Sequence, residues 1–204
     1  VDAQYDAGFY GNYETDEDGI YDLGSACLTN IPGNVSLIGE STEGTVIMNK
    51  APNEGISISA TLCTGGENIY MQDLTVRNAG DNDASAAARR FVAIQENASK
   101  AVYKNVCLQS NQDTYYIRAT QRTYWEGGMI TGTVDYICGG GDIFFNGVTL
   151  YNNSRNNGNC ITAPATNSAW GYVFSNCTID GAAKQNGIYS LGRPWQGSPR
   201  AVYI

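Results

Sequence analysis

The chain has 204 residues, of which 42% are hydrophobic and 11% aromatic, enough apolar material for one folded domain with a sizeable core. The net charge of −8 and the sequence pI of about 4.4, with no Lys/Arg cluster, argue against a nucleic-acid partner. Because no apolar run reaches the ~20 residues of a membrane span, we expect a soluble protein without a membrane partner.

The N-terminal third contains short predicted elements. Residues 1–18 are polar and acidic, which predicts a solvated entry segment. Residues 34–40 and 45–48 predict two short strands joined by a turn, and residues 56–62 alternate apolar and polar side chains as a strand does. No stretch has sustained helical periodicity, so we expect an all-β protein.

From residue 71 onward one short pattern recurs five times. Each copy has a large apolar residue, an apolar or small residue three positions later and an aliphatic residue two positions after that, with strand-like alternation. The copies begin 20 to 32 residues apart, a variable period typical of solenoid coils with loops of different length. We therefore expect a parallel β-solenoid. The copies start at Met71, Tyr103, Trp125, Phe145 and Phe174.

Two aspartates occupy equivalent positions in consecutive repeats. Asp113 lies ten residues after Tyr103, and Asp135 lies ten residues after Trp125. Equivalent positions on adjacent coils are ~4.8 Å apart, where two carboxylates repel by on the order of 3 kcal/mol at an effective dielectric of ~20. One of them is expected to keep its proton. Either aspartate alone is more simply a turn residue, but the in-register pair favours a catalytic dyad.

The residue types limit the chemistry further. Without any histidine, Ser-His-Asp and Cys-His catalysis are excluded, and the scattered cysteines do not favour a zinc site, so we predict no metal. Disulfides and buried thiols both stay open, and Cys107 and Cys177 suit core packing at least as well as bridging. The six cysteines are Cys27, Cys63, Cys107, Cys138, Cys160 and Cys177.

A dyad of carboxylates leaves three enzyme classes open. A glycosidase with two carboxylates, a lyase, and an esterase with a carboxylate nucleophile all fit the residues so far. Lyases of this architecture commonly use calcium and a basic residue, and no Asp-rich calcium cluster accompanies Asp113 and Asp135.

Three sequence motifs favour one of these enzyme classes. Residues 112–116 (Gln-Asp-Thr-Tyr-Tyr), 132–139 (Gly-Thr-Val-Asp-Tyr-Ile-Cys-Gly) and 191–195 (Leu-Gly-Arg-Pro-Trp) resemble the main motifs of the pectin methylesterases, in family order. Weaker likeness extends upstream, so the resemblance covers roughly residues 20–204. It implies a right-handed parallel β-helix, secretion, and demethylation of homogalacturonan without metal or cofactor.

The resemblance also implies individual roles. Asp135 would attack the ester carbonyl carbon, while Asp113 would protonate the departing methanol and then activate water. Arg193 would hold Asp135, Gln112 would donate to the oxyanion, and Trp195 would offer a flat face to a sugar. Taken singly, an Arg–Asp pair is more often structural and a Trp beside Pro is more often packing, and only the conjunction of motifs favours these roles.

Three further residues are candidate substrate contacts. Tyr116 and Tyr136 lie within the motifs, and Arg90 stands where the family typically has a glutamine that supplies a second oxyanion contact. A guanidinium there can stabilise an oxyanion or bind a neighbouring uronate, but it also fits altered specificity or lost activity. The alternative function is therefore a pectin-binding β-helix without turnover or with changed specificity.

Both ends of the chain look short beside that family. We expect residues 1–204 to form a single β-helix catalytic domain that lacks terminal coils or caps at both ends. The resemblance implies pectin as the partner and says nothing of oligomeric state.

Overall fold

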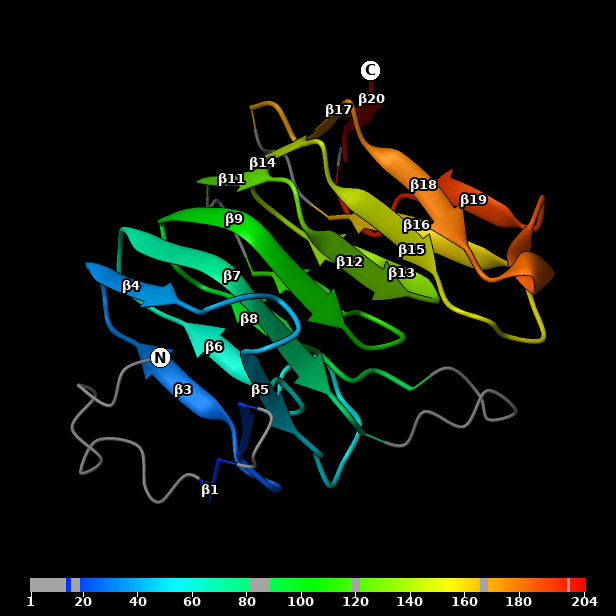
Figure 1. Cartoon of the computed structure of the whole chain (residues 1–204). Coiled ribbons are helices and arrows are strands. Elements are labelled where there is room, and N and C mark those ends of the chain that lie inside the picture. The colour runs from blue at the N-terminus through cyan, green and yellow to red at the C-terminus, as the bar shows by residue number, and fades with distance from the viewer. Residues whose placement is uncertain (1–13, 16–18, 81–88, 119–121, 166–168, 198) are drawn as a thin grey trace.

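The computed structural model describes residues 14–15, 19–80, 89–118, 122–165, 169–197 and 199–204. Most of the predicted entry segment 1–18 lies outside them. The described residues are all-β apart from one 3₁₀ turn, η1 (Ala183–Gln185). Figure 1 shows the strands stacked side by side in layers along the chain from the N-terminal to the C-terminal end. The fold is a right-handed parallel β-helix, as predicted.

The strands form two sheets, and their only antiparallel pairing in the described residues joins β1 to β2. The larger sheet contains β1 (Glu14–Thr15), β2 (Ile20–Asp22), β4 (Val35–Ile38), β5 (Val46–Asn49), β7 (Ile69–Asn78), β9 (Lys100–Gln109), β11 (Arg122–Glu126), β12 (Met129–Gly132), β14 (Asp142–Asn146), β15 (Thr149–Asn152), β17 (Tyr172–Ser175), β18 (Thr178–Gly181) and β20 (Ala201–Tyr203). The smaller sheet contains β3 (Leu28–Ile31), β6 (Leu62–Thr64), β8 (Ile94–Glu96), β10 (Tyr115–Ile117), β13 (Val134–Gly139), β16 (Asn159–Pro164) and β19 (Tyr189–Gly192).

Each coil contributes to both sheets. In one coil β11 and β12 lie in the larger sheet and β13 in the smaller one, and the next coil repeats this order with β14, β15 and β16. In the earlier coils the single ten-residue strands β7 and β9 take the place of two strands. Strands 34–40 and 45–48 of the sequence prediction are β4 and β5, which pair in parallel with the two halves of β7.

The first residue of each predicted repeat lies in one ladder through the core. Met71 pairs with Tyr103, and the ladder continues through the other three first residues in strict register. The ring centroids of Tyr103 and Trp125 are 4.6 Å apart, and those of Phe145 and Phe174 are 4.4 Å apart. Their side chains are at most 1% exposed, so this aromatic stack is the central part of the core.

The third position of each repeat explains a bend in the larger sheet, which lies within β7 and β9 and between two strands in the later coils. It is Asp73, Asn105, Gly127, Gly147 or Asn176, and all five have φ between 47° and 67°. This left-handed conformation is accessible to glycine and, at small cost, to Asn and Asp. Each repeat therefore carries its own bend, which lets the chain turn from one face of the coil to the next.

The predicted strand at residues 56–62 is wrong. The backbone amides of Ile58 and Ser59 both donate to the Gly55 carbonyl, at 3.2 and 3.1 Å, so this segment is a turn. Ile58 is 70% exposed, and strand pairing begins only at Leu62. The polar residues of this segment serve the turn and not a strand face. The Ser59 hydroxyl, for example, donates to the Arg90 carbonyl at 3.0 Å.

A carboxyl group lies inside the core. Glu96 is completely buried at the end of β8, and it accepts hydrogen bonds from the hydroxyls of Thr64 and Tyr103 and from the Ala98 amide at 2.9 Å. The Tyr115 hydroxyl is 3.4 Å from the same carboxyl. Burial raises the pKa of Glu96, and the hydrogen bonds oppose that rise.

Candidate active site

Asp113 and Asp135 lie on neighbouring coils in the register that the sequence predicts. Tyr115 pairs with Ile137, which places each aspartate two residues before a paired position, and the Asp113 amide donates to the Val134 carbonyl at 3.2 Å. Both aspartates have positive φ, 60° and 52°, which an Asp tolerates better than most residues. Their carboxyl groups are close enough for the charge of Asp135 to act on Asp113.

The two carboxyl groups are similarly buried but have different charged neighbours. Asp113 and Asp135 are only 4% and 7% exposed. Burial raises the pKa of Asp113 to about 7, the charge of Asp135 adds to the rise, and the cations Arg90 and Arg193 oppose it. Asp113 is therefore poised to carry a proton near neutral pH.

Arg193 is the direct partner of Asp135. Its Nε and Nη2 atoms donate to the two carboxylate oxygens of Asp135 at 2.8 and 2.5 Å, a forked geometry that only arginine provides. The Arg193 amide donates to the Thr162 carbonyl at 2.9 Å, so the segment after β19 is anchored on β16. The arginine side chain is 59% exposed and covers the outer side of a carboxylate that is 10% exposed.

Gln112 and Arg90 form a pair of neighbours beside the dyad. They make an isolated parallel bridge, and the Phe91 amide donates to the Gln112 carbonyl at 3.2 Å. Arg90 thus lies one coil below Gln112, with its charge acting on Asp113. Gln112 itself is half-buried next to Asp113.

Glu54 is a site residue that the sequence reasoning missed. Its carboxylate oxygens accept from Nε and Nη2 of Arg90 at 2.8 and 2.7 Å. The two side chains are 40% and 46% exposed, so solvent weakens this pair. Glu54 is 36 residues before Arg90 in a turn with no motif of its own, and only the stacking of coils brings the two together.

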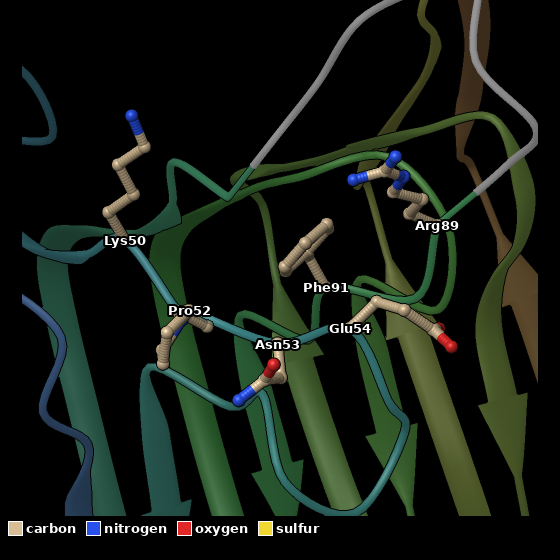
Figure 2. Close-up of a pocket in the computed structure, with 7 residues that line it drawn as sticks. Lys50, Pro52, Asn53, Glu54, Arg89 and Phe91 are labelled. Carbon is tan, nitrogen blue, oxygen red and sulfur yellow. The ribbon is translucent and has the colours of Figure 1, made fainter.

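A cavity of about 550 Å³ opens beside this ion pair (Figure 2). Glu54 lines it, and Lys50 and Arg89 add two cations to its wall. In Figure 2 the segment that carries Lys50 to Glu54 forms one side of the cavity, and Arg89 lies opposite. The cavity lies on the coils that precede the dyad, and neither Asp113 nor Asp135 lines it.

Two of the three predicted aromatic contacts lie together. Tyr116 on β10 is half-buried and Trp195 is 44% exposed, with ring centroids 6.4 Å apart and an interplanar angle of 55°. The Trp195 amide donates to the Pro164 carbonyl at 3.0 Å, which anchors the Trp195 backbone to the end of β16. The two rings form a partly exposed aromatic surface, and Tyr116 follows Asp113 by three residues on the same coil.

Tyr136 does not belong to this surface. It is completely buried in the hydrophobic core, so the expectation that it contacts substrate is wrong in this structure. The left-handed turn at Asp135 breaks the alternation of the strand and directs the next side chain inward. A Cβ atom at Gly132 would lie 2.1 Å from the Tyr136 Cβ, which shows how closely the tyrosine packs on that glycine.

Two thiols lie next to the carboxylates. Cys138 is buried beside Asp113, and Cys160 lies beside Asp135. Burial raises the pKa of both thiols, so they are neutral neighbours of the dyad. The motif that contains Cys138 pointed to this region, but nothing in the sequence placed Cys160 there.

The described residues hold no group of three or more His, Cys, Asp or Glu side chains that could bind a metal ion. In the same part of the chain, no helix has the length and apolar character needed to cross a membrane.

Comparison with known proteins decides the family. The family model described as Pectinesterase matches residues 17–204. The chain belongs to the pectinesterase family. Pectinesterase 2 of Citrus sinensis is 29% identical over 184 residues, which cover 84% of this chain and 35% of that protein. Probable pectinesterase/pectinesterase inhibitor 35 of Arabidopsis thaliana is 32% identical over 186 residues, which cover 86% of this chain and 33% of that protein.

Solved pectin methylesterases share the fold. Pectin methylesterase PemA from Erwinia chrysanthemi has a TM-score of 0.73 and 27% identity, over 86% of this chain and 61% of that one. The enzyme from Yersinia enterocolitica has a TM-score of 0.74 and 27% identity, over 91% of this chain and 68% of that one. This pectinesterase-family chain spans about a third of the length of the two curated relatives.

Proposed function

We propose that this chain hydrolyses the methyl esters of homogalacturonan to pectate and methanol. The observation that carries the proposal is the asymmetry of the in-register dyad: Arg193 forks onto Asp135, while burial raises the pKa of Asp113 to about 7. Two carboxyl groups in different environments can divide the roles of nucleophile and acid. The names of the relatives support the same reaction.

In the first half of the reaction, the Asp135 carboxylate attacks the carbonyl carbon of the ester. The tetrahedral intermediate collapses, methanol leaves with the proton of Asp113, and an anhydride joins Asp135 to the uronate. Arg193 keeps the attacking carboxylate oriented. Gln112 donates to the oxyanion, a contribution that is typically on the order of 3 kcal/mol.

In the second half, Asp113 acts as base. Having lost its proton to methanol, it takes one from water, which attacks the anhydride and releases Asp135. The raised pKa of Asp113 suits both steps, because a group near neutrality gives and takes a proton with little cost.

The surface around the dyad fits a polysaccharide. Tyr116 and Trp195 offer apolar ring faces to sugars, and a pectin methylesterase 26% identical to this chain has been solved in complex with a hexasaccharide. Arg90 is proposed to contact substrate near the oxyanion through whichever of its donors Glu54 leaves exposed. Since pectin is a cell-wall polymer, we also propose that the protein acts outside the cell.

The second candidate is pectin binding without turnover. The observation that favours it is the Arg90–Glu54 pair, because a guanidinium already held by a carboxylate is a weaker oxyanion partner than a free amide. This role predicts affinity for pectin without release of methanol.

Methanol release from highly methylated pectin tests the proposal. Wild type, Asp135→Asn and Asp113→Asn are compared with Asp180→Asn, an exposed aspartate on β18 that serves as the control. We expect release from wild type and the control and its loss in both dyad variants. A folded wild type that binds pectin but releases no methanol supports the second candidate, and an unsaturated, absorbing product indicates a lyase.

A further inference from the structure

A pair of thiols meets on the coils that precede the dyad. The Sγ atoms of Cys27 and Cys63 are 3.7 Å apart, and both side chains are half-buried. Cys27 directly precedes β3, and Cys63 is the middle residue of β6. The two residues are 36 positions apart in the chain, and the pairing of Leu28 with Leu62 brings them to adjacent coils.

This contact lies at the end of the smaller sheet. Strand β3 is the last strand in its order and pairs within the described residues with β6 alone, whereas β6 also pairs with β8. The pairing of β3 with β6 contains a register shift between Leu28 and Ile31. An edge strand held from one side by an irregular ladder is the part of a solenoid that opens most easily.

We propose that Cys27 and Cys63 form a reversible disulfide that staples this terminal strand to the coil stack. A disulfide has an S–S distance of about 2.05 Å, so the two sulfur atoms must approach by about 1.7 Å. Rotation of two half-exposed side chains at the end of a sheet can supply that movement. The inference does not depend on the proposed ester hydrolysis.

The surroundings assign different roles to the two thiols. The contact with Cys27 lowers the pKa of Cys63 against the effect of burial, and the cation of Arg118 lowers it further, whereas the contact with Cys63 and burial raise the pKa of Cys27. Since the thiolate is the nucleophile, Cys63 is the sulfur that reacts first.

The oxidant is a small-molecule disulfide such as oxidised glutathione. The Cys63 thiolate attacks one of its sulfur atoms, forms a mixed disulfide and expels one thiolate. Cys27 then loses its proton, attacks Sγ of Cys63 and expels the second thiolate. Two protein thiols are oxidised, one small disulfide is reduced, and the two protons end on the two released thiols.

The staple closes a loop of 36 residues in the unfolded chain, so it restricts the unfolded ensemble and retains the edge strand in the folded one. For a chain of this size we expect the melting temperature to rise on the order of 10 °C.

The test treats the folded protein with oxidised glutathione and then identifies the linked peptides by mass spectrometry. Wild type is compared with Cys27→Ser and Cys63→Ser, and with Cys107→Ser, a half-buried thiol on β9, as the matched control. We expect one Cys27–Cys63 cross-link and the rise in melting temperature in wild type and Cys107→Ser, both reversed by dithiothreitol. Circular dichroism verifies that each variant is folded.

Three outcomes overturn the proposal. The first is a folded wild type that retains both free thiols after oxidation. The second is a cross-link between other cysteines. The third is a dithiothreitol-sensitive stabilisation that persists in folded Cys27→Ser.

Discussion

Two carboxyl groups, Glu96 in the core and Asp113 in the site, are both buried, but the groups that surround them differ. Both have a raised pKa, and burial is the largest cause for each. Around Glu96 the partners are neutral donors, two of them core hydroxyls. Around Asp113 they are charges: Asp135 raises its pKa, while Arg90 and Arg193 lower it. Neutral donors hold a carboxyl group in place, whereas charges of both signs around it can keep its pKa close to neutral pH, where it gives and takes a proton readily.

The largest expected effect is on the site. Asp135→Asn removes the proposed nucleophile and the negative charge beside Asp113, so methanol release should fall on the order of 10⁴-fold. The melting temperature should change little compared with that loss, because Arg193 is mostly exposed and its partner keeps the same shape. Retention of more than a tenth of wild-type activity would contradict the assignment of the nucleophile.

The corresponding change in the core should affect stability. Glu96→Ala leaves the hydroxyls of Thr64 and Tyr103 without their acceptor and opens a cavity, so the free energy of unfolding should fall by about 4 kcal/mol. Urea unfolding measures this. Glu126→Ala, at the exposed end of β11, is the control and should cost less than about 0.5 kcal/mol. Equal costs for the two variants would mean that the core network does not stabilise the fold.

Asp113 should make stability depend on pH. Its folded pKa of about 7 lies above the ordinary value of 3.8, so the folded state retains the proton more strongly than the unfolded state. Stability is therefore lost as pH rises from about 4 to 7, by up to about 4 kcal/mol at 1.36 kcal/mol per pKa unit. Asp113→Asn cannot ionise and should be more stable than wild type at pH 8.

That comparison has an internal check. At pH 3 and below, well under the ordinary pKa of 3.8, Asp113 is protonated in both states, so wild type and Asp113→Asn should have similar free energies of unfolding. Chemical denaturation at both pH values, with Asp180→Asn as control, separates this effect from a general gain. A difference that does not change with pH rules out Asp113 ionisation as its cause.

The smallest expected effect concerns Glu54. Its charge raises the pKa of Asp113, and its carboxylate holds Arg90. Glu54→Gln should therefore move the alkaline limb of the kcat/KM profile to lower pH. The corresponding change in the free energy of Asp113 ionisation should be less than about 1 kcal/mol, because the Glu54–Arg90 pair is exposed. Glu67→Gln, another exposed glutamate, should leave the profile unchanged. A shift toward higher pH would contradict the sign of this coupling.

Much of the coil stack follows from local rules. A large apolar residue, a corner residue that accepts positive φ and an aliphatic residue recur in each repeat, and the ladder from Met71 to Phe174 follows that order. The register of Asp113 with Asp135 follows as well, because each lies ten residues after the first residue of its repeat and those two first residues, Tyr103 and Trp125, pair. Residues 56–62 misled because alternation alone does not reveal which backbone groups will pair.

The sequence by itself determined the repeat, the stacked aspartates and the family motifs, since each depends on a pattern of residue types that recurs along the chain. Only the tertiary structure decided that Tyr136 turns inward, that Glu54 holds Arg90, that Glu96 sits among core hydroxyls and that Cys27 meets Cys63. These contacts join residues on different coils or on opposite sides of a corner. Their geometry depends on loop lengths and on the left-handed turns, which a local pattern does not specify.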